Sequence, residues 1–204
     1  MRSTYNRRTA TKVKNGRVQH KNRLLPTGAL GCTYGRERPG RGFHHVVSKR
    51  DLQAFIDIIP EWHQFSRRLE HVVLASPNDQ DDGQYAFYHR EKTGGIFLHA
   101  WPDDLWTELS PAYFEAHRGI LERLGVSVER LRDGVLCRFT ETQARAFTLL
   151  HVFMHELGHH HDRIIRKGGS THGEDYAERF ANNQFNQLFP TYVRVFGDPR
   201  KEVR

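Results

Sequence analysis

The longest regular pattern of apolar positions in the chain lies between residues 140 and 166. Apolar side chains recur there every three or four residues, the spacing of one buried helix face, at Ala144, Phe147, Leu150, Phe153, Met154 and Leu157. A threonine at position 140 or 142 is a suitable N-cap, and a Lys-Gly-Gly sequence follows at 167–169 as a helix end. We therefore predict one long, largely buried helix from about Thr140 to about Arg166.

Three other helices follow from apolar periodicity and end signals. The first begins with an N-cap at Ser48 and is interrupted at Pro60, and its apolar face consists of Leu52, Phe55, Ile56 and Ile59. The second lies between Ser110 and Gly125, with a proline in its first turn. The third runs from about residue 173 to 189 and ends at Pro190. Together with the long helix, these elements make up much of the chain beyond residue 47.

Short runs of β-branched and aromatic residues predict the strands. They are FHHVV at 43–47, HVVLAS at 71–76, QYAFYHR at 84–90, GGIFLHAW at 94–101 and GVLCRF at 134–139. Turn-rich sequences separate the three central runs. The order of elements predicts an α+β fold, in which a helix is followed by a small, mostly antiparallel sheet and then by further helices.

Positive charge is concentrated near the N-terminus. The net charge is +7, but residues 1–50 contain 13 Lys or Arg and one acidic residue, Glu37. Residues 1–23 contain eight of these bases and no acid, so we expect a disordered arm, then a Gly/Pro-rich loop at 24–42 and a globular domain at 43–204. Such an arm suits nonspecific nucleic-acid binding, while a solvated arm without a ligand and a transit peptide remain alternatives.

Composition narrows the class of protein. An apolar content of 37% with 13 Phe is enough for a core. No stretch approaches the roughly 20 apolar residues of a membrane helix, and the N-terminus lacks the apolar centre of a secretory signal, so we expect no membrane association. The two cysteines, Cys32 and Cys137, are too few for a disulfide framework or a cysteine-only zinc site. A reducing, cytoplasmic location is therefore the expectation.

Candidate chemistry lies within the long helix. Five histidines crowd residues 149–163, and His155-Glu156-Leu157-Gly158-His159 has the spacing H-E-x-x-H. Helix positions four apart share a face, so both imidazoles can bind one Zn²⁺ at about 2.0–2.1 Å. Glu156 is offset by one position and is placed to act as a base instead of a ligand. Gly158 weakens the helix by up to about 1 kcal/mol relative to Ala, which indicates that another backbone passes close to it.

A third ligand is expected from the last helix, because a catalytic zinc has three protein ligands and one open position. The candidates are His172, Glu174, Asp175 and Glu178. Glu174 and Glu178 are four apart, so one can bind the ion while the other hydrogen-bonds a ligand histidine. Thr171-x-x-Glu174 is also a capping-box pattern, in which Glu174 would only cap the helix.

The two motifs together resemble a known family. His155-Glu156-x-x-His159 followed by Glu174-x-x-Ala177-x-x-Phe180-Ala181 is similar to the zincin metallopeptidases with a glutamate third ligand, and most similar to the ImmA/IrrE group, over roughly residues 145–185. The resemblance implies a zincin-like fold, one zinc ion per chain and Glu174 as the third ligand. Glu178 departs from the group, which often has Asn or Asp at that position.

Further side chains are candidates for the surroundings of the metal. His151, one turn before His155, is expected to be a satisfied core histidine in preference to a cleft residue. Asp162 is placed to orient a ligand, and His160 and His161 are expected to face solvent or the ligands. The donor to a developing oxyanion is open among His172, Tyr176 and Tyr192. An edge strand, either 94–101 or 134–139, is expected to pair with an extended substrate.

These features predict a zinc-dependent metallopeptidase whose substrate is a protein or peptide. Zinc lowers the pKa of its water toward about 7, and Glu156 takes the proton during attack on the carbonyl and delivers it to the leaving amine. The alternative is a nucleic-acid-associated regulator with a zincin-like body that cuts little, which the basic arm favours and the intact Glu156 disfavours. A closed structural zinc would require a fourth ligand such as His172.

Overall fold

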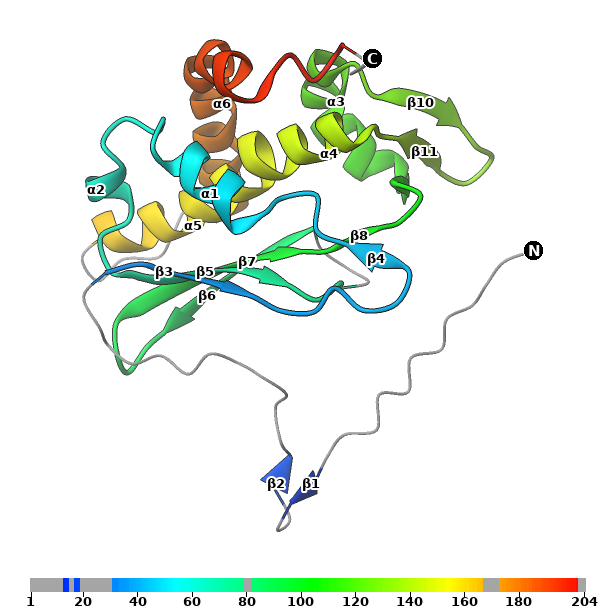
Figure 1. Ribbon diagram of the computed structural model, residues 1–204. Coiled ribbons are helices and arrows are strands. Elements are labelled where there is room, and N and C mark those ends of the chain that lie inside the picture. The colour runs from blue at the N-terminus through cyan, green and yellow to red at the C-terminus, as the bar shows by residue number, and fades with distance from the viewer. Residues whose placement is uncertain (1–12, 15–16, 19–30, 79–81, 167–172, 202–204) are drawn as a thin grey trace.

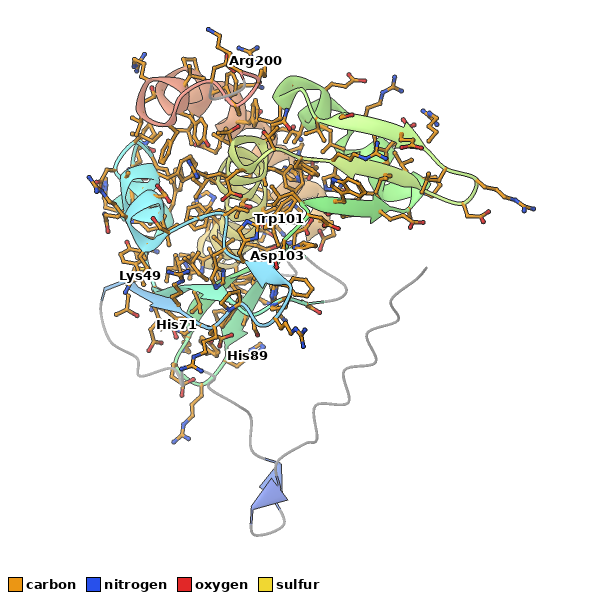
Figure 2. All side chains as sticks on the ribbon, turned by 45° about the vertical axis from the view of Figure 1, so that its right-hand side comes forward. Lys49, His71, His89, Trp101, Asp103 and Arg200 are labelled. Carbon is orange, nitrogen blue, oxygen red and sulfur yellow. The ribbon has the colours of Figure 1, made fainter. Side chains whose placement is uncertain are left out.

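The computed structural model describes residues 13–14, 17–18, 31–78, 82–166 and 173–201. The fold is α+β, with helices packed on one face of a four-stranded sheet (Figure 1). Figure 2 shows Trp101 among the side chains between these layers and Lys49, His89 and Arg200 at the outside. Trp101 is 5% exposed and its indole Nε1 donates to Thr148 Oγ1 at 3.0 Å, which ties the sheet side to the long helix.

The main sheet is mixed, so the expectation of a mostly antiparallel sheet is wrong. Its strands are β3 (Thr33–Arg36), β5 (Leu69–Ala75), β7 (Thr93–His99) and β6 (Gly83–Tyr88), in that spatial order. The pairs β3–β5 and β5–β7 are parallel, and only β6–β7 is antiparallel. Every residue of β5 is buried, and the strand lies inside the sheet between β3 and β7. The sheet therefore presents β6 as the edge strand nearest the helices.

Strand β3 lies inside the stretch that the sequence predicts to be a loop. The residues Thr33-Tyr34-Gly35-Arg36 show no apolar alternation, and their strand conformation comes from pairing with β5, nearly forty residues later. Thr33 also donates from its hydroxyl to the Glu70 carbonyl at 3.1 Å. A parallel pair needs such a long connection, so local sequence carries little signal for it.

The connection between β3 and β5 contains the first two helices. Helix α1 (Lys49–Ile56) begins at a capping box between Ser48 and Asp51, and α2 (Trp62–Phe65) follows the interruption at Pro60. The predicted N-cap is confirmed, whereas the helix already ends at Ile56, four residues before the proline at which its interruption was predicted. The four residues predicted to form the apolar face are all buried, namely Leu52, Phe55, Ile56 and Ile59.

A second part of the fold consists of helix α3 (Pro111–Leu124) and short strands beside it. This helix begins at Ser110 and ends at Gly125, which has a positive φ of 70°, so both predicted ends are confirmed. A three-stranded antiparallel sheet of β10 (Ser127–Arg130), β11 (Val135–Arg138) and β9 (Trp106–Leu109) flanks it, and β4 (Phe43–His44) pairs with β8 (Trp101–Pro102). This part of the fold brings α3 opposite the long helix.

The long helix is continuous but changes its winding. Helix α4 (Glu141–Phe147) begins at a Thr140 capping box, a π-helical segment η1 (Thr148–Phe153) follows, and α5 (Met154–Ile165) completes it. The predicted bounds are confirmed to within one residue at each end. The wide π turn was not predicted; such turns are frequent at functional sites, and this one directly precedes the H-E-x-x-H motif.

Helix α6 (Glu174–Phe196) extends past Pro190, so the predicted end at that proline is wrong. Pro190 has no N–H to donate to the preceding turn. The residues beyond it nevertheless gain burial, because Tyr192 is 1% exposed and packs edge-on against Phe55 with ring centroids 6.2 Å apart. Core packing of the final turns outweighs the lost hydrogen bond.

The basic arm expected at residues 1–23 lies outside the described residues, except for β1 (Val13–Lys14) and β2 (Arg17–Val18), which pair antiparallel. Among the described residues no helix has the length and apolar character needed to span a membrane. Cys32 and Cys137 are both free thiols.

Candidate metal centre

Helix α5 presents the two motif histidines side by side. His155 and His159 are four residues apart, and their Nε2 atoms lie 3.1 Å from each other. Both side chains are about four-fifths buried, with 17% and 20% exposure. The nitrogen lone pairs of the two rings therefore converge on one point beside the helix, as the spacing predicts.

Glu174, the first residue of α6, completes a three-sided group. Its Oε2 lies 3.1 Å from His155 Nε2 and its Oε1 lies 3.4 Å from His159 Nε2. Ligands at about 2.0–2.1 Å from one tetrahedral ion are separated by about 3.3 Å. The three side chains thus have the separations that a bound metal ion requires, and they form a group that could hold one.

The Glu174 side chain is 81% exposed, so solvent reaches the group from the α6 side. The N-cap of α6 is Gly173, which has no side chain to cap the helix. Thr171, the proposed capping partner of Glu174, lies outside the described residues, as does His172. Asp175 is exposed at the second position of α6. Of the candidates for the third ligand that the structure describes, Glu174 and Glu178 contact the histidines.

Glu178 contacts the opposite nitrogen of His155. Its Oε2 lies 3.3 Å from His155 Nδ1, and Asn182 Nδ2 donates to its Oε1 at 2.9 Å. Burial favours the protonated acid, but the contact with His155 and the nearby His151 and His117 lower the pKa of Glu178 to about 2. An ionised carboxylate beside Nδ1 orients the ring and makes Nε2 a better metal ligand.

The two histidines sit in different electrostatic surroundings. Burial opposes the charged form of His155, but its contact with the Glu178 carboxylate and the charges of Glu156 and Glu174 raise its pKa above the ordinary value. Burial lowers the pKa of His159, and the neighbouring His155 lowers it further. The acidic groups that surround His155 also offset the charge of a bound cation.

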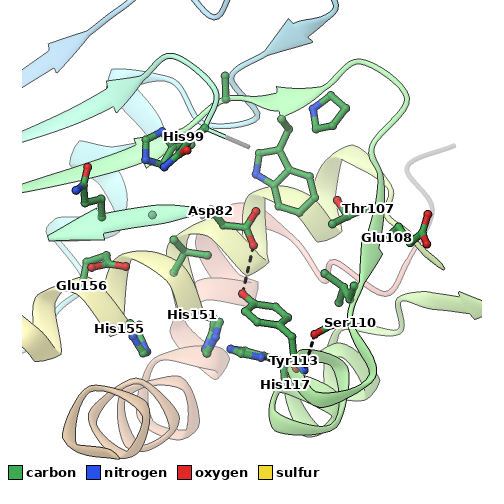
Figure 3. Close-up of a pocket in the computed structure, with 18 of the residues that line it drawn as sticks. Asp82, His99, Thr107, Glu108, Ser110, Tyr113, His117, His151, His155 and Glu156 are labelled. Atoms are coloured by element: carbon green, nitrogen blue, oxygen red, sulfur yellow. Dashed lines mark hydrogen bonds between the residues drawn. The ribbon is translucent and has the colours of Figure 1, made fainter. Parts of the chain in front are cut away.

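Glu156 is buried at 8% exposure and lies against the edge strand β6. A Cβ placed on Gly83 would lie 3.1 Å from Glu156 Cγ and Oε1 and 2.5 Å from Val152 Cγ1. Glycine at this position therefore allows the strand to approach the helix and to border the carboxylate. Figure 3 shows Glu156 and His155 on neighbouring positions of the helix, facing the cavity.

Gly158 has the close backbone contact that its position in the helix predicts. A Cβ on Gly158 would lie 2.9 Å from the Ala177 Cα and 3.2 Å from the Ala177 carbonyl oxygen. Ala177 is itself fully buried. This contact lets α6 cross α5 closely enough for Glu174 to reach the two motif histidines.

The group opens into a cavity of about 830 Å³. Its walls come from β6, the β8–β9 region, α3, the η1–α5 helix and the start of α6. On the α3 side, Tyr113 stacks on His117 with ring centroids 3.9 Å apart, and its hydroxyl lies 3.4 Å from Asp82 Oδ2 (Figure 3). His117, Tyr113 and Asp82 were not predicted, because α3 and the residue before β6 share no sequence motif with the H-E-x-x-H helix.

The other histidines of the motif region agree with expectation only in part. His160 is fully buried, and its ring nitrogens contact Tyr85 Oη at 3.2 Å and the Arg67 carbonyl at 3.0 Å, so the expected solvent-facing position is wrong. His161 contacts Tyr176 Oη through Nδ1 at 2.8 Å. His151 is 2% exposed and lines the cavity, and its Nδ1 has no hydrogen-bond partner in the described part of the chain. It is therefore buried as expected but not satisfied.

The remaining predicted residues are dispersed. Asp162 is buried and forms an ion pair with Arg166 Nε at 3.1 Å, and its negative charge acts to raise the pKa of His159. Tyr192 lies in the hydrophobic core and does not line the cavity, so it is not an oxyanion donor. Tyr176 is directed to His161 and does not line the cavity either.

Neither predicted substrate-pairing strand is a sheet edge. Strand β7 lies between β5 and β6, and β11 lies between β10 and β9. The edge that borders the cavity is β6, through Gly83, Gln84 and Tyr85. Strand order depends on non-local pairing, and the sequence pattern of each strand does not encode it.

Comparison with protein-family models, with curated proteins and with solved structures found no match to this chain. The geometry of the site therefore carries the functional argument.

Proposed function

We propose that the protein is a zinc-dependent metallopeptidase. The observation that supports this most strongly is the group of His155 Nε2, His159 Nε2 and both Glu174 oxygens, separated by 3.1–3.4 Å, with Glu156 next to it. Two imidazoles and one carboxylate are a common ligand set of catalytic zinc. The exposed side of Glu174 and the adjoining cavity leave room for water and substrate.

The sequence resemblance to zincins with a glutamate third ligand agrees with this proposal. The two sequence motifs that resemble those of zincins lie on α5 and α6, and these helices pack closely at Gly158 and Ala177. Each motif contributes residues to the proposed site, since α5 contains the two histidines and Glu156 while α6 contains Glu174. An antiparallel edge strand beside the motif helix is compatible with a zincin-like arrangement.

The residues have separate roles in the proposed reaction. A zinc ion supplies Lewis acidity and makes water a stronger acid at neutral pH. Glu156 accepts the proton of the attacking water and returns it to the leaving amine. Glu178 holds His155 through Nδ1, and the buried Asp162 lies one turn beyond His159. The contact with Glu178 fixes the orientation of the His155 ring before substrate arrives.

The proposed substrate is an extended segment of a protein or peptide. Strand β6 has no second partner among the described strands, and its residues Gly83 to Tyr85 border the cavity. Backbone pairing to this edge would position a peptide carbonyl near Glu156, with side-chain selection left to the cavity walls. Tyr85 lines the same wall, stacked near His159 with centroids 6.5 Å apart, and its hydroxyl is engaged by His160.

An unbiased peptide-library cleavage screen tests the function. We expect the zinc-loaded wild type to generate new peptide ends and Glu156→Gln to generate none, because an amide cannot accept the proton. Zinc content is measured in both proteins and is expected to be equal. Equal zinc would show that the variant is inactive because it lacks the carboxylate base and not because it lacks the metal. Equal cleavage by the two proteins, or none by the wild type in the complete library, contradicts the proposal.

The basic N-terminal residues favour one other candidate, a nucleic-acid-associated regulator that hardly cleaves. Residues 1–23 contain eight Lys or Arg and no acidic residue. Binding through them would weaken with salt, with a log–log slope of about −0.9 per phosphate neutralised on duplex DNA. The test is a titration of the full chain and a chain lacking residues 1–23 against DNA and RNA at two salt concentrations. Equal binding by both chains, or none by either, removes this candidate.

A further inference from the structure

Three more ligand-type side chains converge beside the proposed zinc centre. They are His117 from α3, His151 from η1 and Glu178 from α6. One nitrogen of each imidazole and one carboxylate oxygen lie within 4.8 Å of one another. Three helices that are distant in sequence thus bring two imidazoles and a carboxylate to one point.

His117 offers a defined nitrogen to this group. Its Nδ1 lies 2.8 Å from the Tyr113 carbonyl oxygen, which can only accept a hydrogen bond, so Nδ1 carries the hydrogen. Nε2 is therefore the nitrogen with a lone pair. The Tyr113 ring stacks on the imidazole at 3.9 Å and holds it against the cavity wall (Figure 3).

His151 supplies a buried polar atom that lacks a partner. The residue is 2% exposed, and no described residue hydrogen-bonds its Nδ1. Its ring centroid lies 4.9 Å from that of His117, and Figure 3 shows the two rings next to each other. Buried polar atoms nearly always have a partner, so this nitrogen indicates an interaction beyond the protein's own groups.

Glu178 provides negative charge between the two groups of histidines. Asn182 donates to its Oε1 at 2.9 Å and His155 faces its Oε2 at 3.3 Å. Each carboxylate oxygen has two acceptor directions, so Glu178 can bind a cation while it keeps these contacts. Its side chain is 31% exposed and lies beside the cavity that contains His117 and His151.

We propose that His117, His151 and Glu178 form a second site for a divalent transition-metal cation, adjacent to the first. Imidazole nitrogen and carboxylate oxygen together suit Zn²⁺ and neighbouring first-row ions. Ligands of one such ion are separated by about 3.3 Å, so a bound ion would draw these three ligand atoms, which lie within 4.8 Å of one another, closer together. The ligands differ from those of the first site, so the proposal does not rest on the proposed function.

Zinc stoichiometry of the full chain tests the second site. Chelator-stripped protein is equilibrated with buffered Zn²⁺, and bound metal is counted in wild type, His117→Ala, His159→Ala and the double variant. His63→Ala, at an exposed histidine on α2, is the matched control. We expect two zinc ions in the wild type and the control, one in each single variant and none in the double variant.

The outcomes separate the two sites. A wild type that binds one zinc, retained in His117→Ala and lost in His159→Ala, overturns the second site and leaves the first intact. One zinc that is lost in His117→Ala and retained in His159→Ala supports the second site and contradicts the first. Circular dichroism verifies folding, and if His117→Ala is unfolded, His117→Gln replaces it as a polar side chain at the same helical position.

Discussion

Gly158 of α5 contacts the backbone of Ala177 of α6 so closely that a Cβ on the glycine would lie 2.9 Å from the Ala177 Cα. The obstacle is main chain, which cannot rotate out of the way as a side chain can. The separation of the two helices, and with it the position of Glu174 relative to the motif histidines, therefore depends on the absence of one methyl group.

We predict that Gly158→Ala destabilises the protein and weakens zinc binding. Alanine improves helix propensity by up to about 1 kcal/mol, but overpacking against a backbone costs about 1–3 kcal/mol. The matched control is Gly119→Ala on α3, where a Cβ meets nothing within 4 Å. That exposed substitution is expected to stabilise by about 0.5–1 kcal/mol. Denaturant unfolding measures both, and a Gly158→Ala variant as stable as Gly119→Ala contradicts the packing argument.

A second glycine prediction concerns strand β6. A Cβ on Gly83 would lie 2.5 Å from Val152 Cγ1 and 3.1 Å from Glu156 Oε1, so Gly83→Ala must displace the strand or the side chains of Val152 and Glu156. The three proposed zinc ligands do not contact this position. We expect peptide hydrolysis to fall by at least about tenfold, the equivalent of 1.4 kcal/mol in the barrier, while zinc content stays unchanged. If both the rate of hydrolysis and the zinc content are unchanged, the activity does not depend on the close approach of β6 to Glu156.

The local features of the site were predictable from the sequence, and the non-local ones were not. The side-by-side positions of His155 and His159 follow from helix geometry alone, and the role of Gly158 follows from its unfavourable propensity in a helix. The position of His117 depends on the packing of α3 against η1, for which the sequence has no motif. Strand β3 and the interior position of β7 likewise depend on pairing between segments that are far apart in the chain.

Pro190 shows how tertiary packing overrides a local signal. A proline normally ends a helix because it lacks the N–H of the ladder, yet α6 continues to Phe196. Tyr192 and Phe196 stack on each other with centroids 4.7 Å apart, and Tyr192 is buried in the core. The apolar residues beyond the proline are visible in the sequence. Whether their burial outweighs the effect of the proline depends on the position of Phe55, which the sequence pattern does not give.

Protonation of His71 is expected to contribute to acid destabilisation. His71 is 2% exposed on β5, its Nε2 lies 2.8 Å from Tyr88 Oη, and burial lowers its pKa below the ordinary 6.5. The unfolded chain therefore binds the proton more tightly than the folded protein does. The contribution of neutral His71 to the free energy of unfolding is complete above the pKa of the unfolded chain and is lost as the pH falls below that value. His71→Gln cannot titrate, so its unfolding free energy should decrease less than that of wild type between about pH 7.5 and about pH 5.5.

The comparison is made with chelator present, so that loss of metal at low pH does not contribute. His63→Gln is the matched control, because it makes the same substitution at an exposed histidine. Parallel pH profiles for wild type and His71→Gln would show that His71 protonation has no part in the acid response.

The final prediction ranks the two acidic residues of α6. Glu174 lies within 3.4 Å of the Nε2 atoms of both His155 and His159, whereas Glu178 contacts His155 from the opposite, Nδ1 side. Glu174→Ala should therefore abolish tight zinc binding at the first centre. Glu178→Ala should weaken it by about 10–100-fold, the usual effect of losing a carboxylate that orients a ligand histidine. Zinc titrations of both variants are made in the His117→Ala background, so that only binding at the first centre is measured. The reverse ranking would make Glu178 the ligand and reduce Glu174 to a residue at the start of the helix.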